Sequence, residues 1–445
     1  MPASSNSSTN NPAVLRAGIA SFCVLASYYL VRPIRDEISS EYPDDVANMW
    51  TWTAILSLVI MPLYTAVASK SSSRHLAPRV YLSVAAILTT FAAIFYFDLA
   101  SNAAVLNQSF YVISSLYALF VVSVLWSTLT GTFSSSQSKK QAGRVFSAGT
   151  LGGLLGSATV SFSPETLAVE IFLIGAVILI MPAAWALKSL AALQPAAEAE
   201  THSNEAESAE PGMATAATKP KVAKPISERL ETGWKRLLKS RYLQGIGLYL
   251  LLFVCGSGFL YFMQKDILHQ YSDRGERRKI LGSMDLGVQI LTVATQFFMT
   301  SQVIRRWGMP VTLTIVPVLT VVGFGALAAA QTFWVLAALV VLRRATNFAL
   351  AKPAREILYT VVSPQERYLT KPLLDVGIYR FGDLATAWMY EGIKALTSFG
   401  VAGMALVAIP FAGASIPVAR WLGRRQEELA TAEETVVEAE TTTPR

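Results

Sequence analysis

The residues best suited to chemistry form a charged cluster near the N-terminus, Tyr28-Tyr29-Leu30-Val31-Arg32-Pro33-Ile34-Arg35-Asp36-Glu37. The cluster closes an apolar stretch of about twenty residues, the length that a membrane-spanning helix needs. Arg32 and Arg35 are three residues apart and share one helical face. Arginine presents a fork of donors that suits phosphate or carboxylate. The pair predicts an anion site that Asp36 and Glu37 neutralise when it is empty; the alternative is a pair that snorkels to the outer interface.

Further charged and polar residues lie in or beside apolar runs later in the chain. A charge inside a spanning helix is unfavourable unless it is paired or hydrated, so each such position is a candidate for an internal cavity. Helical spacing puts Arg343 with Asn347 on one face, and Asp375, Tyr379 and Asp383 on one stripe. The full set of candidate substrate ligands is Arg32, Arg35, Asp36, Lys265, Asp266, Asp285, Arg343, Asn347, Lys371, Asp375, Tyr379, Arg380 and Asp383.

Structural roles compete with binding at several of these positions. Lys265 and Asp266 stand at the end of an apolar run, where they could cap a helix. Asp285 could be the partner of a structural charge. Lys371 and Asp375 could form a cytoplasmic gate or determine topology, and Arg380 could pair with Asp383, three residues away.

The elements that must position these residues are membrane-spanning helices. Hydrophobic residues make up 53% of the chain and charged residues only 15%, which is too apolar for an ordinary soluble protein. At roughly 20 apolar residues per span, the sequence predicts about twelve helices. They are expected near 12–31, 47–69, 77–98, 105–130, 142–161, 166–190, 241–264, 281–302, 309–329, 332–351, 372–396 and 400–421. Gly149, Gly152, Gly153 and Gly156 suit close helix packing in lipid.

A polar segment divides these helices into two sets of six, so the fold class is an all-α membrane protein with two six-helix bundles, as in the major facilitator fold. The expected organisation is a disordered N-terminus at 1–11, an N-terminal bundle at 12–190, a cytoplasmic linker at 191–240, a C-terminal bundle at 241–425 and a disordered acidic tail at 426–445. Apolar residues at helical spacing after 225 favour either a helix on the inner membrane surface or an extension of the seventh helix.

The distribution of basic loops predicts that both termini are cytoplasmic. The loops after the second, fourth, eighth and tenth expected helices carry Lys or Arg, whereas those after the third, fifth and ninth have neither. Two places disagree with this rule: the arginines that close the first apolar run, and the basic residues at 274–279, whose role the sequence leaves open. The chain is expected to be an integral protein of a bacterial inner membrane, surrounded by the lipid bilayer.

Several functions are excluded by missing signals. The three histidines fall in separate loops, and no Walker motif or GxSxG elbow is present, so neither an enzyme nor an ATP-driven pump is expected. Cys23 and Cys255 lie inside apolar runs and indicate no disulfide or metal site. No cofactor is expected. The net charge of +7 follows from the cytoplasmic loops and does not indicate nucleic acid binding. A monomer is expected.

Tyr28 to Asp36 resembles the first-helix signature of the nucleotide (ATP/ADP) translocases of plastids and intracellular bacteria, with Arg35 where that family has a lysine. Ser123-Val124-Leu125-Trp126 is similar to the family's fourth-helix region. Arg355-Glu356-Ile357-Leu358-Tyr359, with Lys371 and Asp375, resembles its tenth-to-eleventh connection. The chain departs at Ser115, where the family has an acidic residue, and at Leu260 and Tyr261, where it has a glutamate. The resemblance implies the major facilitator fold and nucleotide transport.

The sequence therefore predicts a secondary transporter that carries an organic or phosphorylated anion by alternating access, with nucleotide exchange favoured. The alternative is a facilitator-type carrier of another solute, such as a drug, amino acid or sugar, coupled to protons through Asp36, Asp285 or Asp383. A membrane scaffold or sensor is disfavoured because it has no use for charges at membrane depth.

Overall fold

The computed structural model describes residues 12–70, 73–99, 102–132, 135–191, 226–298 and 300–442, and within these ranges it contains helices and no strands. Nine of the described helices are long and apolar enough to cross a membrane. The expected disordered N-terminus at 1–11, the linker from 192 to 225 and the last three residues of the tail lie outside the described ranges.

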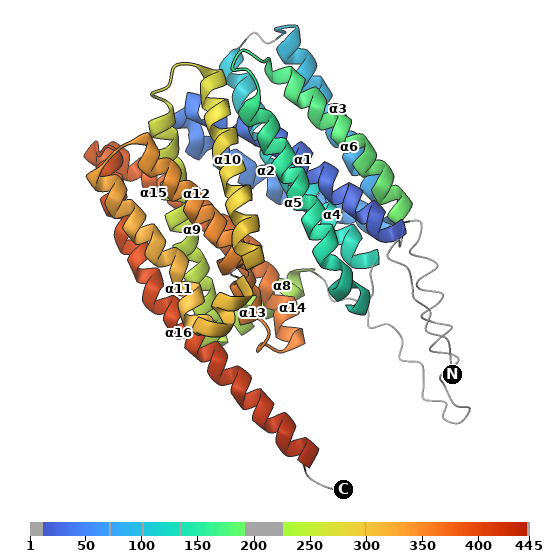
Figure 1. Cartoon of the computed structure of the whole chain (residues 1–445), viewed down its shortest axis with the longest axis vertical. Helices are drawn as coiled ribbons and strands as arrows, with labels where there is room; N and C mark the ends of the chain where they lie inside the picture. The colour runs from blue at the N-terminus through green and yellow to red at the C-terminus, as the bar shows by residue number, and fades with distance from the viewer. Residues whose placement is uncertain are drawn as a thin grey trace. The chain divides into compact units, whose positions relative to one another are not determined.

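The first half of the chain forms six helices of membrane-spanning length (Figure 1). They are α1 (Pro12–Glu41), α2 (Val46–Lys70), α3 (Ser73–Tyr96), α4 (Ala103–Thr132), α5 (Ser135–Phe162) and α6 (Val169–Ala191), with a short 3₁₀ turn, η1 (Pro43–Asp45), between the first two. The bounds of α2, α4 and α6 lie close to the expected runs, whereas α1 extends well beyond its expected end at residue 31 and α5 begins before its expected start at residue 142.

The second half forms six further rods after a short helix, α8 (Ile226–Lys239). Two of these rods contain a π-helical segment. The elements are α9 (Arg241–Leu268), α10 (Arg274–Phe298), α11 (Thr300–Ala329), the rod made of α12 (Phe333–Thr346), η2 (Asn347–Ala351) and α13 (Lys352–Leu358), the rod made of α14 (Pro364–Pro372), η3 (Leu373–Ile378) and α15 (Tyr379–Thr397), and finally α16 (Val401–Thr442).

Helix α1 passes through Pro33 and continues to Glu41, so the charged cluster lies inside the helix instead of ending it as expected. A proline removes one backbone hydrogen bond and usually kinks or ends a helix. Here the residues beyond it are held by burial, because Ile34 and Ile38 have no exposed surface. The apolar area that they remove from water favours continuing the helix.

One compact unit comprises the described parts of Met1–Ser39, Ile55–Thr218 and Asp273–Leu286. Within it α3 packs along α6 and also contacts α4, and Figure 1 shows α3 and α6 side by side. Helices α1 and α5 approach closely at glycines, since a Cβ on Gly152 would lie 2.0 Å from the Phe22 carbonyl oxygen and one on Gly156 would lie 2.5 Å from that of Ala26. The prediction of close packing is confirmed at both positions.

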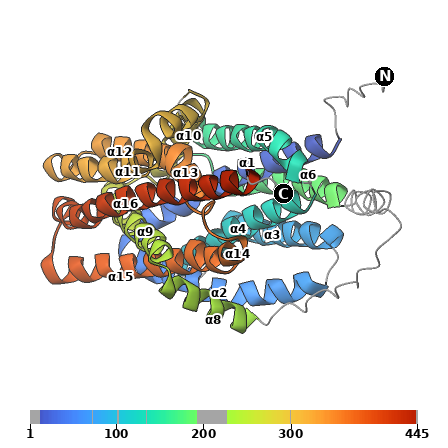
Figure 2. The ribbon, with the colours of Figure 1, turned by 90° about the horizontal axis from the view of Figure 1, so that it is seen from below.

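The other unit comprises Ser40–Ala54, Lys219–Ser272 and Gly287–Arg445. Helix α9 is its centre: it contacts α15 and α16 (Figure 2), and most of its residues are buried. Its Tyr249 and Leu250 pack with Leu313, Leu358 and Leu374 in the main hydrophobic cluster of this unit. The start of α2 thus groups with the second half of the chain, and the start of α10 with the first half.

The structure tests two expectations, one about the segment before α9 and one about the acidic tail. Helix α8 is separate from α9, because Ser240 adopts an extended conformation and its side chain caps α9 by accepting a hydrogen bond from the Leu243 N–H. The acidic tail was expected to be disordered from 426, but α16 continues to Thr442. Close to residue 426, the Glu427 carboxylate accepts a hydrogen bond of 2.9 Å from the Met309 N–H and so ties this part of α16 to α11.

Candidate functional site

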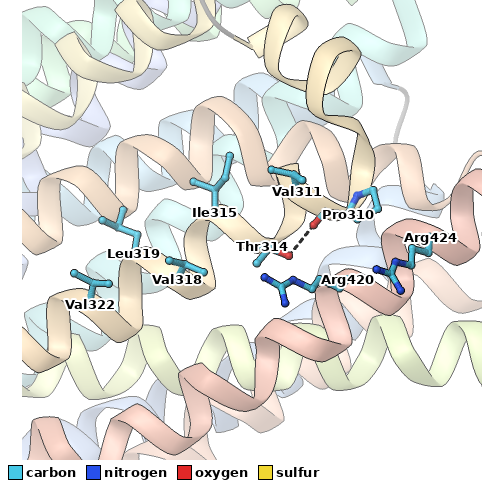
Figure 3. A pocket seen from close by; sticks show the side chains of 9 residues that line it. All are labelled: Pro310, Val311, Thr314, Ile315, Val318, Leu319, Val322, Arg420 and Arg424. Carbon is cyan, nitrogen blue, oxygen red and sulfur yellow. Dashed lines mark hydrogen bonds between the residues drawn. The ribbon is translucent and has the colours of Figure 1, made fainter.

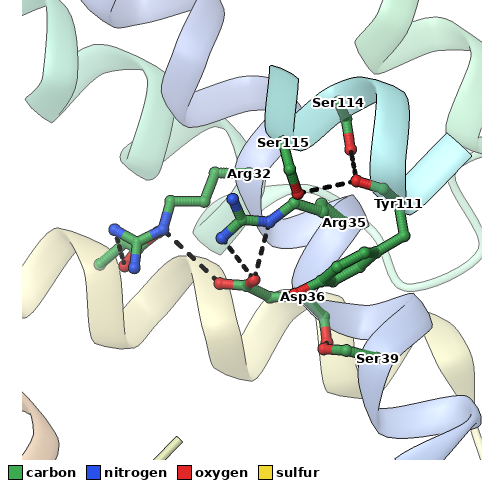
Figure 4. Close-up of polar contacts among 8 residues, drawn as sticks. Arg32, Arg35, Asp36, Ser39, Tyr111, Ser114 and Ser115 are labelled. Atoms are coloured by element: carbon green, nitrogen blue, oxygen red, sulfur yellow. Dashed lines mark hydrogen bonds and ion pairs between the residues drawn. The ribbon is translucent and has the colours of Figure 1, made fainter. Parts of the chain in front are cut away.

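Arg32 and Arg35 share the carboxylate of Asp36 (Figure 4). Arg35 donates two hydrogen bonds, of 2.7 and 3.0 Å, to one carboxylate oxygen, and the Arg32 Nε lies 3.5 Å from the other. The second partner of Arg32 comes from α10, where the Asp285 carboxylate is 3.3 Å away. Two arginines and two aspartates therefore balance one another in a largely buried cluster of the first unit.

Helix α4 faces Arg35 with an aromatic ring and hydroxyl groups. The Arg35 guanidinium lies 5.7 Å from the centre of the Tyr111 ring, a distance that suits a cation–π contact. Ser114 and Ser115 donate hydrogen bonds to the Tyr111 carbonyl oxygen one turn earlier (Figure 4). Where the translocases have an acidic residue, this chain thus presents the hydroxyl of Ser115, so the position adds no negative charge beside Arg35.

Glu37 does not neutralise the arginine pair, contrary to the expectation from sequence. Its fully buried carboxylate lies 2.5 Å from Arg274 and 3.5 Å from Arg278, both in the first turns of α10. Adjacent residues on a helix point about 100° apart, so Glu37 faces a different neighbour from Asp36. A buried carboxylate requires such partners, because an unpaired one is strongly unfavourable.

The basic segment at the start of α10 is held within the first unit. Besides Glu37, Arg278 binds the Leu167 carbonyl oxygen at 2.7 Å, and Lys279 pairs with Glu165 at 3.1 Å. These contacts give the basic residues at 274–279 a role in tertiary packing, which the sequence had left open.

Arg343 is a buried cation of the second unit that is surrounded by neutral groups. Only 5% of its surface is exposed, and its guanidinium donates to the hydroxyls of Thr320 and Ser257, each at 2.9 Å, and to the Phe253 carbonyl oxygen at 3.1 Å. These acceptors are all neutral. Among the described residues it has no carboxylate partner, which is unusual for a charge at membrane depth.

Arg355 lies near Arg343. Both guanidinium groups lie 4.9 Å from the Phe253 ring centre, and Arg355 contacts the Asn347 amide oxygen at 3.4 Å. In the part of the chain that the structure describes, Arg355 also forms no ion pair. Two cations around one aromatic ring repel each other, so this arrangement favours a third, negatively charged component.

The π-helical segments η2 and η3 are local features that the sequence analysis missed. Segment η2 separates Arg343 from Arg355 and begins at Asn347, and η3 contains Asp375. Such segments are rare and often occur at functional sites. The available signal was a proline beside each one, Pro353 and Pro372, because a proline removes an N–H from the helical ladder.

The candidates around η3 have separate partners. Lys371 pairs with Glu356 at 2.5 Å, and Asp375 accepts a hydrogen bond of 3.4 Å from the Tyr359 hydroxyl. Burial and the nearby Asp375 carboxylate raise the pKa of Tyr359, so it remains a neutral donor. The expected pairing of Arg380 with Asp383 is present at 3.6 Å. Tyr379 packs against the cluster that contains Phe253.

Lys265 and Asp266 face different partners. The Lys265 ammonium lies 4.4 Å from the Tyr261 ring centre and is buried. Asp266 accepts hydrogen bonds from Tyr390 at 2.5 Å and from Lys394 at 3.1 Å. Lys394 also binds Asp44 at 3.1 Å. Asp266 thus links α9 and α15 to the turn after α1, which favours a structural role for this carboxylate over ligand binding.

Comparison with known proteins agrees with this architecture. No family model matches the sequence. The chain is similar to ADP,ATP carrier protein 2 of Chlamydia pneumoniae, with 24% identity over 223 residues, which cover 45% of this chain and 41% of that protein. The chain therefore matches less than half the length of this curated relative.

Solved structures with the same fold cover nearly the whole chain. The nucleoside transporter NupG is 15% identical, with a TM-score of 0.59, covering 93% of this chain and 98% of NupG. The human organic anion transporter MFSD10 is 13% identical, with a TM-score of 0.53, covering 92% and 100%. The fold is that of the major facilitator transporters, and the chain is an integral membrane protein. Within this class its sequence likeness is to the ADP,ATP carriers, as the cluster in α1 predicted.

Proposed function

We propose that this chain is a secondary transporter of an organic or phosphorylated anion, that it works by alternating access, and that nucleotides are its favoured substrates. The observation that carries the proposal is Arg343. Its buried guanidinium is surrounded by neutral acceptors from α9 and α11, and Arg355 shares the Phe253 ring with it. An anion would supply the missing negative charge and could accept bidentate hydrogen bonds.

The cluster in α1 supports the same proposal in a different way. Asp36 and Asp285 occupy the donors of Arg32 and Arg35 that an anion would use. A substrate phosphate or carboxylate that reaches them must displace these aspartates. Such competition would couple binding to a rearrangement of α1 against α10, which is the kind of differential contact that alternating access requires.

Nucleotides are favoured over other anions because of the likeness to the ADP,ATP carriers and the match of the α1 cluster to the translocase signature. We further propose that the protein is a monomer in the inner membrane of a bacterium, with both termini in the cytoplasm. The even number of rods and the basic loops support this orientation.

A second candidate is a proton-coupled carrier of a drug, amino acid or sugar. The observation that favours it is the position of Asp36 and Asp285, two carboxylates at membrane depth around Arg32. Protonation of either would release the arginine. Asp383 is a third carboxylate in a spanning rod, but it already pairs with Arg380.

Uptake into proteoliposomes tests the proposal. The wild type is expected to accumulate labelled nucleotide, and faster when unlabelled nucleotide is inside. Arg343→Gln should raise the KM tenfold or more, which corresponds to about 1.4 kcal/mol. Arg306→Gln, at an exposed arginine of α11, is the matched control and should have no effect. Transport of only neutral or cationic solutes by the wild type would refute the anion proposal, and uptake driven by a pH gradient alone would favour the second candidate.

A further inference from the structure

A groove of about 580 Å³ runs between α11 and α16 on the second unit (Figure 3). Its wall on α11 extends from Pro310 to Val322 and is mostly apolar, and the hydroxyl of Thr314 within it donates to the Pro310 carbonyl oxygen. Val322, at the far end, is 63% exposed. At 1.5 Å per residue this wall is about 18 Å long. One leaflet of a 30 Å hydrocarbon core is about 15 Å deep, so the groove has the length of a single acyl chain.

The other end of the groove carries two positive charges. Arg420 and Arg424 are four residues apart on α16, so they share a face, and both line the groove (Figure 3). Among the described residues neither forms an ion pair. The acidic group close to this end, Glu427, is engaged by the Met309 N–H. The groove is therefore asymmetric, with a cationic end and an apolar length.

The shape of the cationic end follows from the backbone. Gly308 has a φ of +73° and interrupts α11, and a Cβ on Gly423 would lie 2.4 Å from Pro310. The two helices thus touch at the end that carries the arginines. Toward the other end, the residues that line the groove all belong to α11.

Two tryptophans indicate the depth in the membrane at which the cationic end of the groove lies. Trp307 precedes Gly308 and Trp421 follows Arg420, and both are about half exposed. Tryptophan is enriched where the hydrocarbon meets the headgroups. The arginines beside them therefore lie at the height of lipid phosphates, and the apolar wall lies at the height of acyl chains.

We propose that this groove is a binding site for one anionic phospholipid, with the headgroup phosphate on Arg420 and Arg424 and one acyl chain along Val311, Ile315, Val318 and Val322. Basic pockets between transmembrane helices commonly select anionic headgroups, and arginine can hold a phosphate with two parallel hydrogen bonds. A zwitterionic phosphatidylcholine brings a trimethylammonium group toward the same arginines, so it should bind less tightly.

Native mass spectrometry of the purified full chain tests the site with phosphatidylglycerol and phosphatidylcholine as probes. The wild type should retain one phosphatidylglycerol under conditions that remove phosphatidylcholine. The double variant Arg420→Gln/Arg424→Gln should lower the bound fraction at least tenfold. Val318→Trp keeps both charges but fills the groove, and it should also lower lipid binding. Arg425→Gln is the matched control, because Arg425 pairs with Glu428 and does not line the groove.

The thermal unfolding temperature gives a second readout that does not depend on detecting the bound lipid. Phosphatidylglycerol should raise it for the wild type and for Arg425→Gln, but not for the other two variants. Equal retention of both lipids, or unchanged retention by the double variant, would refute the site. An equal rise with inorganic phosphate alone would assign the arginines to a free anion instead, and a dimer that Val318→Trp abolishes would assign the groove to a second copy of the chain.

Discussion

The Arg32 guanidinium lies 3.3 Å from the Asp285 carboxylate and joins α1 to α10 within one compact unit. Both residues were candidate ligands, and the structure makes them partners. Asp285→Asn and Arg32→Gln should each destabilise the protein by about 1–3 kcal/mol, because each leaves a buried polar group without its partner. The double variant should lose less stability than the sum of the two single variants, with a coupling energy of about 0.5–3 kcal/mol.

Thermal unfolding in detergent, with a double-mutant cycle, checks this prediction. The exposed pair Lys235–Glu231 in α8 is the control and should show negligible coupling, since exposed ion pairs contribute little. If the losses of unfolding free energy at Arg32 and Asp285 simply add, the ion pair makes no net contribution to stability.

Close packing of α1 against α5 predicts strong sensitivity at Gly152. Gly152→Ala would place a methyl group 2.0 Å from the Phe22 carbonyl oxygen, so the helices must move apart, which should destabilise the protein by about 1–3 kcal/mol. Gly413→Ala is the control. A Cβ there meets nothing within 4 Å, and alanine favours a helix by up to about 1 kcal/mol over glycine. Equal unfolding temperatures for the two variants would contradict the close crossing.

Arg35 should be needed for high-affinity anion uptake. Arg35→Ala is expected to weaken affinity by about 2–4 kcal/mol, roughly thirty- to several-hundred-fold, because it removes a charge-assisted contact. Arg35→Lys should fall between, since it keeps the charge without the fork of donors. The measurement is the KM for labelled nucleotide, and the maximal rate is normalised to the amount of protein in the membrane. If Arg35→Ala keeps the wild-type affinity, Arg35 does not bind the substrate.

Cysteine labelling should distinguish the two membrane faces. Cys23 and Cys255 are both buried, so added cysteines will report without much background. A membrane-impermeant maleimide applied outside intact cells should label Ser398→Cys, in the exposed turn after α15, but not Thr360→Cys, in the turn between α13 and α14. The reverse pattern would invert the proposed orientation.

Much of the fold could be predicted because a membrane-spanning helix is recognisable from its own stretch of sequence. Each needs a run of apolar residues long enough to cross the bilayer, and hydropathy finds such runs without knowing their neighbours. The runs near 12–31 and 241–264 are examples, although the helices themselves reach Glu41 and Leu268. The extension of α1 past Pro33 was not predictable, since it depends on what buries Ile34 and Ile38.

The sequence by itself determined which residues are charged at membrane depth and, through helical spacing, that Arg32 and Arg35 share a face. Only the tertiary structure decided their partners. Asp36 and Glu37 are neighbours in sequence, yet one holds the arginines of α1 and the other holds Arg274 of α10. The physical reason is that a charge in a low-dielectric interior must be compensated within a few ångströms. Which opposite charge comes that close depends on how distant helices pack.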